Sequence, residues 1–169
     1  MKYTKDLIQN YQKVLILGAP GSGKSTLAKE ISQEHNIPLA YYDQIRWREN
    51  WIETPKEQTK EKLTELTNQQ AYIIEGTYTK KFDPIIEDCD LIIILKVPSI
   101  VCLSRVLKRT FKSFIAGKKG AREDLPAGCN ESLGIGYLRF LNYTLNYNKL
   151  KGAEMIKHLE KHKHKVKTI

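Results

Sequence analysis

Five short runs, the first four of them mostly apolar, alternate along the chain with longer segments whose apolar residues recur at helical spacing. The runs occupy residues 13–17, 39–43, 71–75, 90–97 and 165–169. Runs of this length, bounded by polar or turn-forming residues, are typical of strands in the middle of an α/β protein. Strands that alternate with helices predict a five-stranded parallel sheet covered by helices on both faces, a three-layer α/β/α architecture.

The first run leads directly into a glycine-rich segment and then into an amphipathic helix. The segment is a complete G-x-x-x-x-G-K-[ST] motif, made of Gly18, Ala19, Pro20, Gly21, Ser22, Gly23, Lys24 and Ser25. In a strand–loop–helix setting, the loop N–H groups and the helix N-terminus bind phosphate together. Lys24 can reach the β- and γ-phosphates of ATP, the Ser25 hydroxyl can bind Mg²⁺, and Thr26 can contact a phosphate or cap the helix. The motif predicts a P-loop NTPase fold that binds ATP and Mg²⁺.

Acidic residues end two of the predicted strands, at Asp43 and at Glu75. Ligands of open α/β sheets bind at the carboxyl ends of the strands, so both side chains are expected near the phosphate loop. Asp43 is predicted to handle metal or substrate, and the alternative is that it caps the following helix. Glu75 is the candidate for the acid beside Mg²⁺ and its waters. Gly76 would let a substrate approach the backbone.

Two tryptophans and two arginines closely follow Asp43, namely Arg46, Trp47, Arg48 and Trp51. Aromatic rings at this edge of a sheet can stack on a base, and arginines can hold a phosphate with two hydrogen bonds. Alternatively, Trp47 and Trp51 lie one helical turn apart and simply pack in the core. The sequence favours neither interpretation over the other.

A basic helix and a basic loop follow the fourth predicted strand. The helix, over residues 99–114, carries Arg105, Lys108, Arg109 and Lys112 at spacings that predict one cationic stripe. The stripe is either a solvated face or a clamp on the transferring phosphate. The glycine-rich, charged loop after it predicts a lid at about residues 115–130, with Arg122 as the candidate lid arginine.

Composition narrows the class of protein. The 169 residues suit a single domain, and the formal net charge of +9 favours anionic partners such as nucleotides. Much of the excess charge lies in residues 108–122 and 149–167, and charged runs of this kind are usually solvated surfaces, so they support nucleic-acid binding only weakly.

Cysteine usage and hydropathy indicate the compartment. Three cysteines without C-x-x-C spacing, Cys89, Cys102 and Cys129, argue against a disulfide framework and against a zinc site. No apolar run is long enough to cross a bilayer, and the N-terminal residues are too polar for a signal peptide. A soluble, cytoplasmic protein without a membrane partner is therefore expected.

Four further motifs accompany the phosphate loop. They are D-x-x-x-W-x-x-x-W-x-x-T over residues 43–54, I-I-E-G-T-Y over 73–78, S-R-V-L-K-R over 104–109 and R-E-D-x-x-x-G-C over 122–129. With them, the sequence resembles the topology modulation protein (FlaR-like) family of adenylate-kinase-like P-loop kinases over nearly its whole length. The tryptophan pair and the R-E-D block are the more specific parts of this resemblance.

The resemblance implies the strand order 2-3-1-4-5, ATP on the phosphate loop and a lid after the fourth strand. It also implies an acceptor site between residues 43–51 and the loop at residues 75–78, in which Gly76 and Tyr78 are the candidate substrate residues beside Glu75. Kinases of this type often carry aspartate where this chain has Glu75, and either acid can hold a metal-bound water.

These features predict an ATP- and Mg²⁺-dependent phosphotransferase that acts on a small acceptor such as a nucleoside or nucleotide. Lys24, Arg105, Arg109 and Arg122 would neutralise the charge of the transferring phosphoryl group, and Asp43 would orient or deprotonate the acceptor. Two alternatives are a nucleotide-binding regulator associated with DNA and a kinase of nucleic-acid 5′ ends. The residues leave the acceptor and the oligomeric state open.

Overall fold

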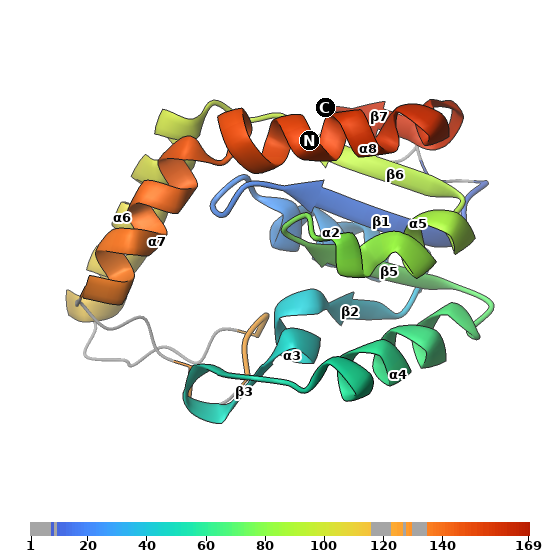
Figure 1. Cartoon of the computed structure of the whole chain (residues 1–169), viewed down its shortest axis with the longest axis horizontal. Coiled ribbons are helices and arrows are strands. Elements are labelled where there is room, and N and C mark those ends of the chain that lie inside the picture. Colours follow the sequence, from blue (N-terminus) through green and yellow to red (C-terminus); the bar gives the residue numbers. More distant parts are fainter. Residues whose placement is uncertain (1–7, 9, 116–122, 127, 130–134) are drawn as a thin grey trace.

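The computed structural model describes residues 8, 10–115, 123–126, 128–129 and 135–169. Five parallel strands form its main sheet: β1 (Lys13–Gly18), β2 (Leu39–Tyr41), β5 (Tyr72–Gly76), β6 (Leu91–Leu95) and β7 (Val166–Thr168). Their order is β2-β5-β1-β6-β7, with β1 in the middle (Figure 1). This confirms the expected α/β fold and the order 2-3-1-4-5.

Helices connect the strands. They are α2 (Lys24–His35), α3 (Tyr42–Arg46), α4 (Lys56–Thr67), α5 (Asp83–Asp88), α6 (Ser99–Ile115), α7 (Ile135–Asn146) and α8 (Ala153–Leu159). Short 3₁₀ segments η1 (Glu49–Trp51), η2 (Lys80–Phe82) and η4 (Glu160–Lys165) and the π-helical segment η3 (Asn148–Gly152) complete the helical part. Strands β3 (Trp47–Arg48) and β4 (Ile52–Glu53) pair as a small antiparallel hairpin.

Each face of the sheet has its own hydrophobic core because side chains alternate along the strands. On one face, Leu15 and Ile74 pack with residues of α4, α5 and α8. On the other face, Val14 and Ile16 pack with α2. Strands buried on both faces explain the continuous apolar runs in the sequence.

Two helices stand beyond the carboxyl ends of the strands. Helices α6 and α7 contact each other side by side and project away from the sheet (Figure 1). At their base, Cys102 of α6 packs with Ala19 of the phosphate loop and with Tyr147. Beyond the carboxyl ends of the strands, α6 and α7 thus lie on one side, and α3 and the β3–β4 hairpin lie on the other.

The second strand ends earlier than its sequence suggests. It ends at Tyr41, and Asp43 lies in the first turn of α3 rather than on the strand. The Tyr42 side chain, only 1% exposed, packs on Phe82 with ring centroids 4.5 Å apart. Because the chain turns to bury Tyr42, the prediction of a strand up to residue 43 was wrong. Tyr41 is the N-cap residue, so Asp43 does not cap the helix either.

Candidate active site

The phosphate loop joins β1 to α2, and its backbone depends on two glycines. Gly21 has φ of 77° and Gly23 has φ of 100°, in the left-handed region that favours glycine. A Cβ on Gly21 would also lie 2.5 Å from the carbonyl oxygen of Cys102 on α6. The loop therefore fits closely against α6 at the N-terminus of α2.

Side chains at the start of α2 meet an acid from the neighbouring strand. Ile16 of β1 pairs with Glu75 of β5, which places the Glu75 carboxylate behind the loop. Lys24 Nζ lies 3.8 Å from Glu75 Oε2, and Ser25 Oγ lies 3.2 Å from Glu75 Oε1. Lys24, Ser25 and Glu75 therefore lie close together at the start of α2.

Glu75 is a buried acid, only 3% exposed. Burial raises the pKa of its carboxyl above the usual value, and the nearby charges of Asp43 and Asp124 act in the same direction. Lys24 and the hydrogen bond from Ser25 oppose this shift in pKa. Glu75 Oε2 accepts no hydrogen bond from the described residues.

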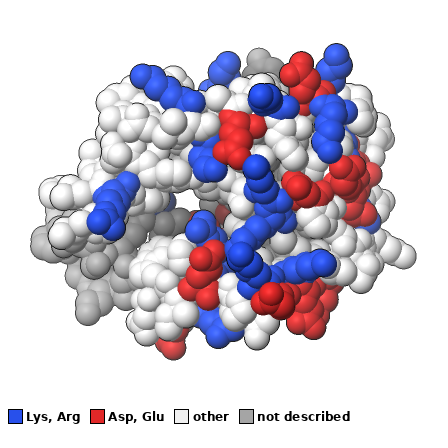
Figure 2. Space-filling model, viewed as in Figure 1, with Lys and Arg blue, Asp and Glu red and all other residues white. Residues whose placement is uncertain are grey.

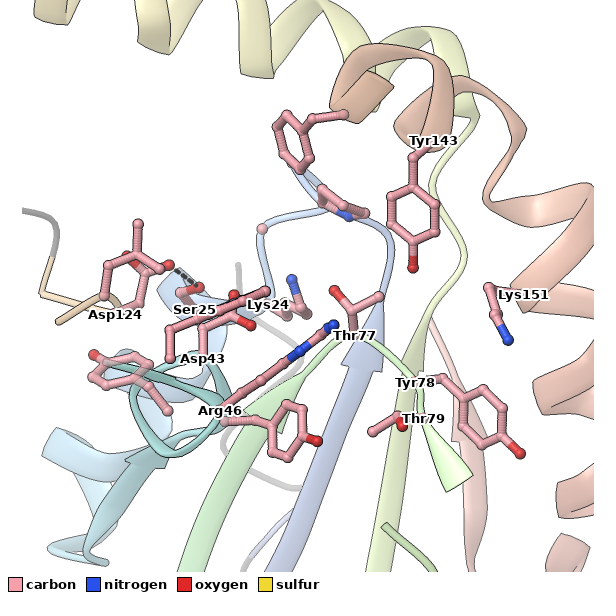
Figure 3. A pocket seen from close by; sticks show the side chains of 18 of the residues that line it. Lys24, Ser25, Asp43, Arg46, Thr77, Tyr78, Thr79, Asp124, Tyr143 and Lys151 are labelled. Carbon is pink, nitrogen blue, oxygen red and sulfur yellow. Dashed lines mark hydrogen bonds between the residues drawn. The ribbon is translucent and has the colours of Figure 1, made fainter. Parts of the chain in front are cut away.

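A second acid reaches Ser25 from a distant part of the chain. Asp124 Oδ2 lies 3.3 Å from Ser25 Oγ, although the two residues are 99 positions apart (Figure 3). Sequence reasoning missed Asp124, because it lies in the loop predicted as a lid and no local pattern connects it with the phosphate loop.

A cavity of about 1650 Å³ opens at the carboxyl edge of the sheet. Predicted site residues that line it are Pro20, Gly21, Gly23, Lys24, Ser25, Thr26, Asp43, Arg46, Trp47, Trp51, Tyr78, Arg105 and Arg109. Gly18, Ala19, Ser22, Glu75 and Gly76 do not line it. The predicted lid arginine, Arg122, lies outside the described residues.

Two of the four cations expected along α6, both arginines, face this cavity. Arg105 donates from Nη1 to the carbonyl oxygen of Ser22 at 3.1 Å, which ties α6 to the phosphate loop. Arg109 lines the cavity one turn further on. Lys108 and Lys112 do not line it, so of the four cations that the sequence placed along this helix, the two arginines are the ones at the cavity.

Arg46 and the tryptophans form the wall opposite α6. The Arg46 guanidinium carbon lies 4.6 Å from the centre of the Trp47 ring, and Nε lies 3.5 Å from Glu53 Oε1. In Figure 3 the side chain of Arg46 extends from α3 toward Lys24 and Thr77. Its stacking on Trp47 holds it in this direction.

The tryptophans do not share a helix. Trp47 belongs to β3 and Trp51 to η1, and their rings meet edge to face with centroids 5.7 Å apart. Trp51 is 39% exposed. The alternative of a helical core pair was therefore wrong, and both rings are available to a ligand in the cavity.

Packing around Gly76 leaves no room for a side chain. A Cβ there would lie 2.8 Å from Tyr42 Cβ and 2.9 Å from Phe82 Cζ. The next residues, Thr77, Tyr78 and Thr79, line the cavity together with Tyr143 and Lys151, as Figure 3 shows. Thr77 and Tyr78 lie in the loop to which the sequence had pointed, whereas no sequence pattern indicated Thr79, Tyr143 or Lys151.

The basic C-terminal residues contact the body of the protein. Lys165 Nζ donates to the carbonyl oxygens of Glu87 and Cys89 at 3.1 and 2.9 Å, and Lys161 pairs with Glu87 at 3.4 Å. On the face in Figure 2, basic and acidic side chains are intermixed around the central hollow rather than gathered in one basic patch. None of the described helices is long and apolar enough to span a membrane.

Comparison with known proteins places this arrangement in a family. A family model described as an AAA domain matches residues 14–114, from β1 and the phosphate loop to α6. The chain belongs to the AAA domain family. No curated protein is similar enough in sequence to count as a match.

One of three similar solved structures has a TM-score above 0.5 and supports the fold. Shikimate kinase from Acinetobacter baumannii, in complex with shikimate, has a TM-score of 0.51 at 14% identity, over 88% of this chain and 82% of that one. Shikimate kinase from Bacteroides thetaiotaomicron has a TM-score of 0.49 at 13% identity, over 85% and 80%. Deoxyadenosine kinase from M. mycoides with bound dATP has a TM-score of 0.44 at 18% identity, over 94% and 90%. At such identities the likeness extends to the fold alone.

Proposed function

We propose that this AAA-domain protein is an ATP- and Mg²⁺-dependent phosphotransferase that acts on a small acceptor. The observation that carries the proposal is that Lys24 of the phosphate loop and Asp43 of α3 line one cavity. A phosphoryl donor and an acceptor bound there would lie side by side, and positioning of this kind supplies most of the catalysis in phosphoryl transfer.

The phosphate side of the cavity provides positive charge. Lys24 would neutralise the β- and γ-phosphates, and Arg105 and Arg109 would approach the transferring group from α6. Arg105 is already fixed to the loop through the carbonyl oxygen of Ser22. A role for Arg122 remains part of the proposal.

Oxygen ligands for Mg²⁺ are present at the same place. The Ser25 hydroxyl and the Glu75 carboxylate are 3.2 Å apart, and Glu75 keeps one buried oxygen without a hydrogen bond from the described residues. Mg²⁺ favours such oxygens together with substrate phosphates and water, so the residues fit this ion. Bound there, Mg²⁺ would offset negative charge on the phosphates.

Asp43 is the candidate for the residue that orients or deprotonates the acceptor. It extends from the first turn of α3 toward Lys24 and Ser25 (Figure 3). A carboxylate in this position can accept the proton of an acceptor hydroxyl as the phosphoryl group arrives.

The acceptor wall favours a planar, anionic molecule. Trp47 and Trp51 offer ring faces, and Arg46 offers a guanidinium that stacks on Trp47 at 4.6 Å. Aromatic rings stack on bases, and arginine binds phosphate or carboxylate. A nucleoside or nucleotide acceptor combines both properties. The tryptophan pair and the R-E-D block also support membership of the topology modulation (FlaR-like) family.

An acceptor screen tests this proposal. Purified protein with ATP and Mg²⁺ is incubated with nucleosides, nucleoside monophosphates, small hydroxy acids or short oligonucleotides, and ADP release is followed. Release that one class stimulates, and that is lost in Lys24→Ala, is the expected result. ATP binding without stimulation by any class would contradict the proposal, and stimulation by oligonucleotides alone would indicate a 5′-end kinase.

A further inference from the structure

Residues 123–126 and 128–129 form a segment that we call the strap, which bridges elements far apart in the sequence. Glu123 pairs with Lys29 of α2 at 2.6 Å, and its carbonyl oxygen accepts a hydrogen bond from Gln44 of α3. Leu125 is 6% exposed. Cys129 Sγ lies 3.2 Å from the carbonyl oxygen of Arg48 on β3. The strap thus packs on both the phosphate side and the acceptor side of the cavity.

The strap brings Asp124 to the hydroxyl that is expected to bind the metal. Ser25 Oγ lies 3.2 Å from Glu75 Oε1 and 3.3 Å from Asp124 Oδ2. A hydroxyl carries one proton, so Ser25 can donate to only one of the two carboxylates at a time. At any moment, therefore, one of the two carboxylates lies beside the Ser25 oxygen without receiving its proton.

The charges around Ser25 also favour a bound cation. The negative charges of Asp43 and Asp124 both act on Glu75, whereas Lys24 provides one compensating positive charge. Glu75 is only 3% exposed, and its Oε2 accepts no hydrogen bond within the described part of the chain. Carboxylates that converge in this way are stabilised by a divalent cation.

From this geometry we propose that Asp124 is a second carboxylate ligand, direct or through water, of the Mg²⁺ bound with the nucleotide. The inference rests on the proposed function for the presence of Mg²⁺ and nucleotide. No group of three His, Cys, Asp or Glu side chains within the described ranges can hold a metal by itself. The Ser25 hydroxyl and the nucleotide phosphates complete the ligand set, which is the mode that Mg²⁺ commonly uses.

This assignment gives the strap a role in binding. If Asp124 contacts the metal only when the strap is docked, metal–nucleotide and docked strap stabilise each other by the same free energy. The strap also contacts Arg48 in the hairpin that carries Trp47. Metal binding at Ser25 therefore favours an ordered acceptor wall.

Equilibrium binding of Mn²⁺ tests the assignment without any turnover. Free Mn²⁺ is measured by electron paramagnetic resonance while protein is titrated in the presence of a non-hydrolysable ATP analogue. Asp124→Asn is expected to weaken Mn²⁺ binding by roughly tenfold to hundredfold, the range known for groups that support a metal site. Ser25→Ala gives the reference value for loss of the hydroxyl ligand that the proposed function assigns to Mg²⁺.

Glu123→Gln is the matched control. It removes the same charge from the neighbouring position and weakens the strap contact with Lys29. The Glu123 carboxylate binds Lys29, whereas the Asp124 carboxylate lies beside Ser25. Because the pair of Glu123 with Lys29 is exposed and such pairs contribute little, its loss is expected to lower Mn²⁺ affinity by less than about fivefold, well short of the loss in Asp124→Asn. Equal losses of Mn²⁺ affinity in the two variants would mean that Asp124 only anchors the strap. An Asp124→Asn variant with the Mn²⁺ affinity of the wild type would also overturn the assignment.

A change of metal preference provides a second readout. Asp124→Cys replaces a hard oxygen by a thiolate, which favours Cd²⁺ over Mg²⁺. Binding of the ATP analogue to this variant is expected to be supported better by Cd²⁺ than by Mg²⁺, relative to the wild type. No change in preference would exclude direct ligation, and the Mn²⁺ affinity of Asp124→Asn then decides whether Asp124 ligates through water. If these binding results hold but no acceptor is phosphorylated, the proposed function fails and the metal assignment stands.

Discussion

The two sides of the cavity are built in different ways. The phosphate side comes from the contiguous residues 18–26 and one buried acid, Glu75, on the adjacent strand. The acceptor side is assembled from α3, the β3–β4 hairpin, residues 77–79, α7 and the strap. A contiguous loop fixes its geometry locally, whereas the acceptor wall depends on tertiary packing. The comparison suggests a general donor site beside a selective acceptor site.

Charge pairing differs between the two sides as well. Around the phosphate loop, Lys24 is almost buried and lies 3.8 Å from the buried Glu75. On the acceptor side, Glu53 pairs with Arg46 and Lys81, and Glu154 pairs with Lys151 at 2.7 Å. Partly exposed pairs are weak and exchange partners readily. An incoming anion can therefore take over these cations at small cost.

The largest effect is expected on the phosphate side. Lys24→Ala should lower phosphoryl transfer by on the order of 10²–10³-fold or more, because it removes the charge that meets the developing negative charge. The measurement is single-turnover transfer from ATP, with circular dichroism melting as the control for folding. Retained transfer in a folded variant would show that Lys24 plays no part in the reaction.

The next effect tests the junction of the two sides. Asp43→Asn should lower kcat by on the order of 10²–10⁴-fold, the usual contribution of a general base, while ATP affinity from equilibrium titration is unchanged. Asp83→Asn serves as the control, since Asp83 pairs with His158 outside the cavity. Equal activities of the two variants would exclude Asp43 as the acceptor-orienting residue.

A pair of neighbours on α6 tests the position of the cationic group. Arg109 lines the cavity and Lys108 does not. Arg109→Ala should reduce kcat/KM by on the order of 10²-fold through loss of a charged donor to the phosphoryl group. Lys108→Ala should change it little. Similar losses in both variants would indicate that net charge, rather than the position of Arg109, matters.

A smaller effect is expected at the acceptor wall. Trp51→Ala should cost about 1–3 kcal/mol of acceptor binding through lost stacking, seen as a higher KM with kcat nearly unchanged. Trp51→Phe keeps a ring and should restore most of the affinity. Since both tryptophans of the chain lie at this wall, quenching of intrinsic fluorescence reports acceptor binding directly. An unchanged KM would exclude Trp51 from the acceptor site.

The smallest effect concerns the pH dependence of stability. Burial raises the pKa of Glu75 above 4.5 in the folded state. The folded protein then holds more protons than the unfolded chain as pH rises from 4.5 through the raised pKa, so this residue makes stability fall over that window. Urea unfolding in EDTA should therefore show a shallower decline for Glu75→Gln than for the wild type. Parallel curves would contradict the raised pKa.

The contrast between a contiguous loop and a wall built by tertiary packing also explains which features could be predicted from the sequence. The phosphate loop was recognisable because its residues are contiguous, and strands β1, β5 and β6 because their continuous apolar runs are buried in the sheet. The end of β2 was misplaced because Tyr42 is buried by Phe82, which lies far along the chain. Local pattern carries no information about such a contact.

The distribution of charge on α6 and the role of Asp124 were beyond sequence reasoning for related reasons. Neighbouring residues such as Lys108 and Arg109 point about 100° apart on a helix, and only the packing of α6 decides which one faces the cavity. Asp124 meets Ser25 across 99 positions. The resemblance to a family pointed to the block around Asp124 but gave no role for its carboxylate.

Transfer of labelled phosphate tests the central claim most directly. The protein is incubated with [γ-³²P]ATP, Mg²⁺ and the acceptor that best stimulates ADP release, and the products are separated. The account predicts label on the acceptor, dependent on Mg²⁺ and absent in Lys24→Ala and Asp43→Asn. Label that appears only as inorganic phosphate, whatever acceptor is supplied, would contradict the claim that this cavity transfers a phosphoryl group between two small molecules.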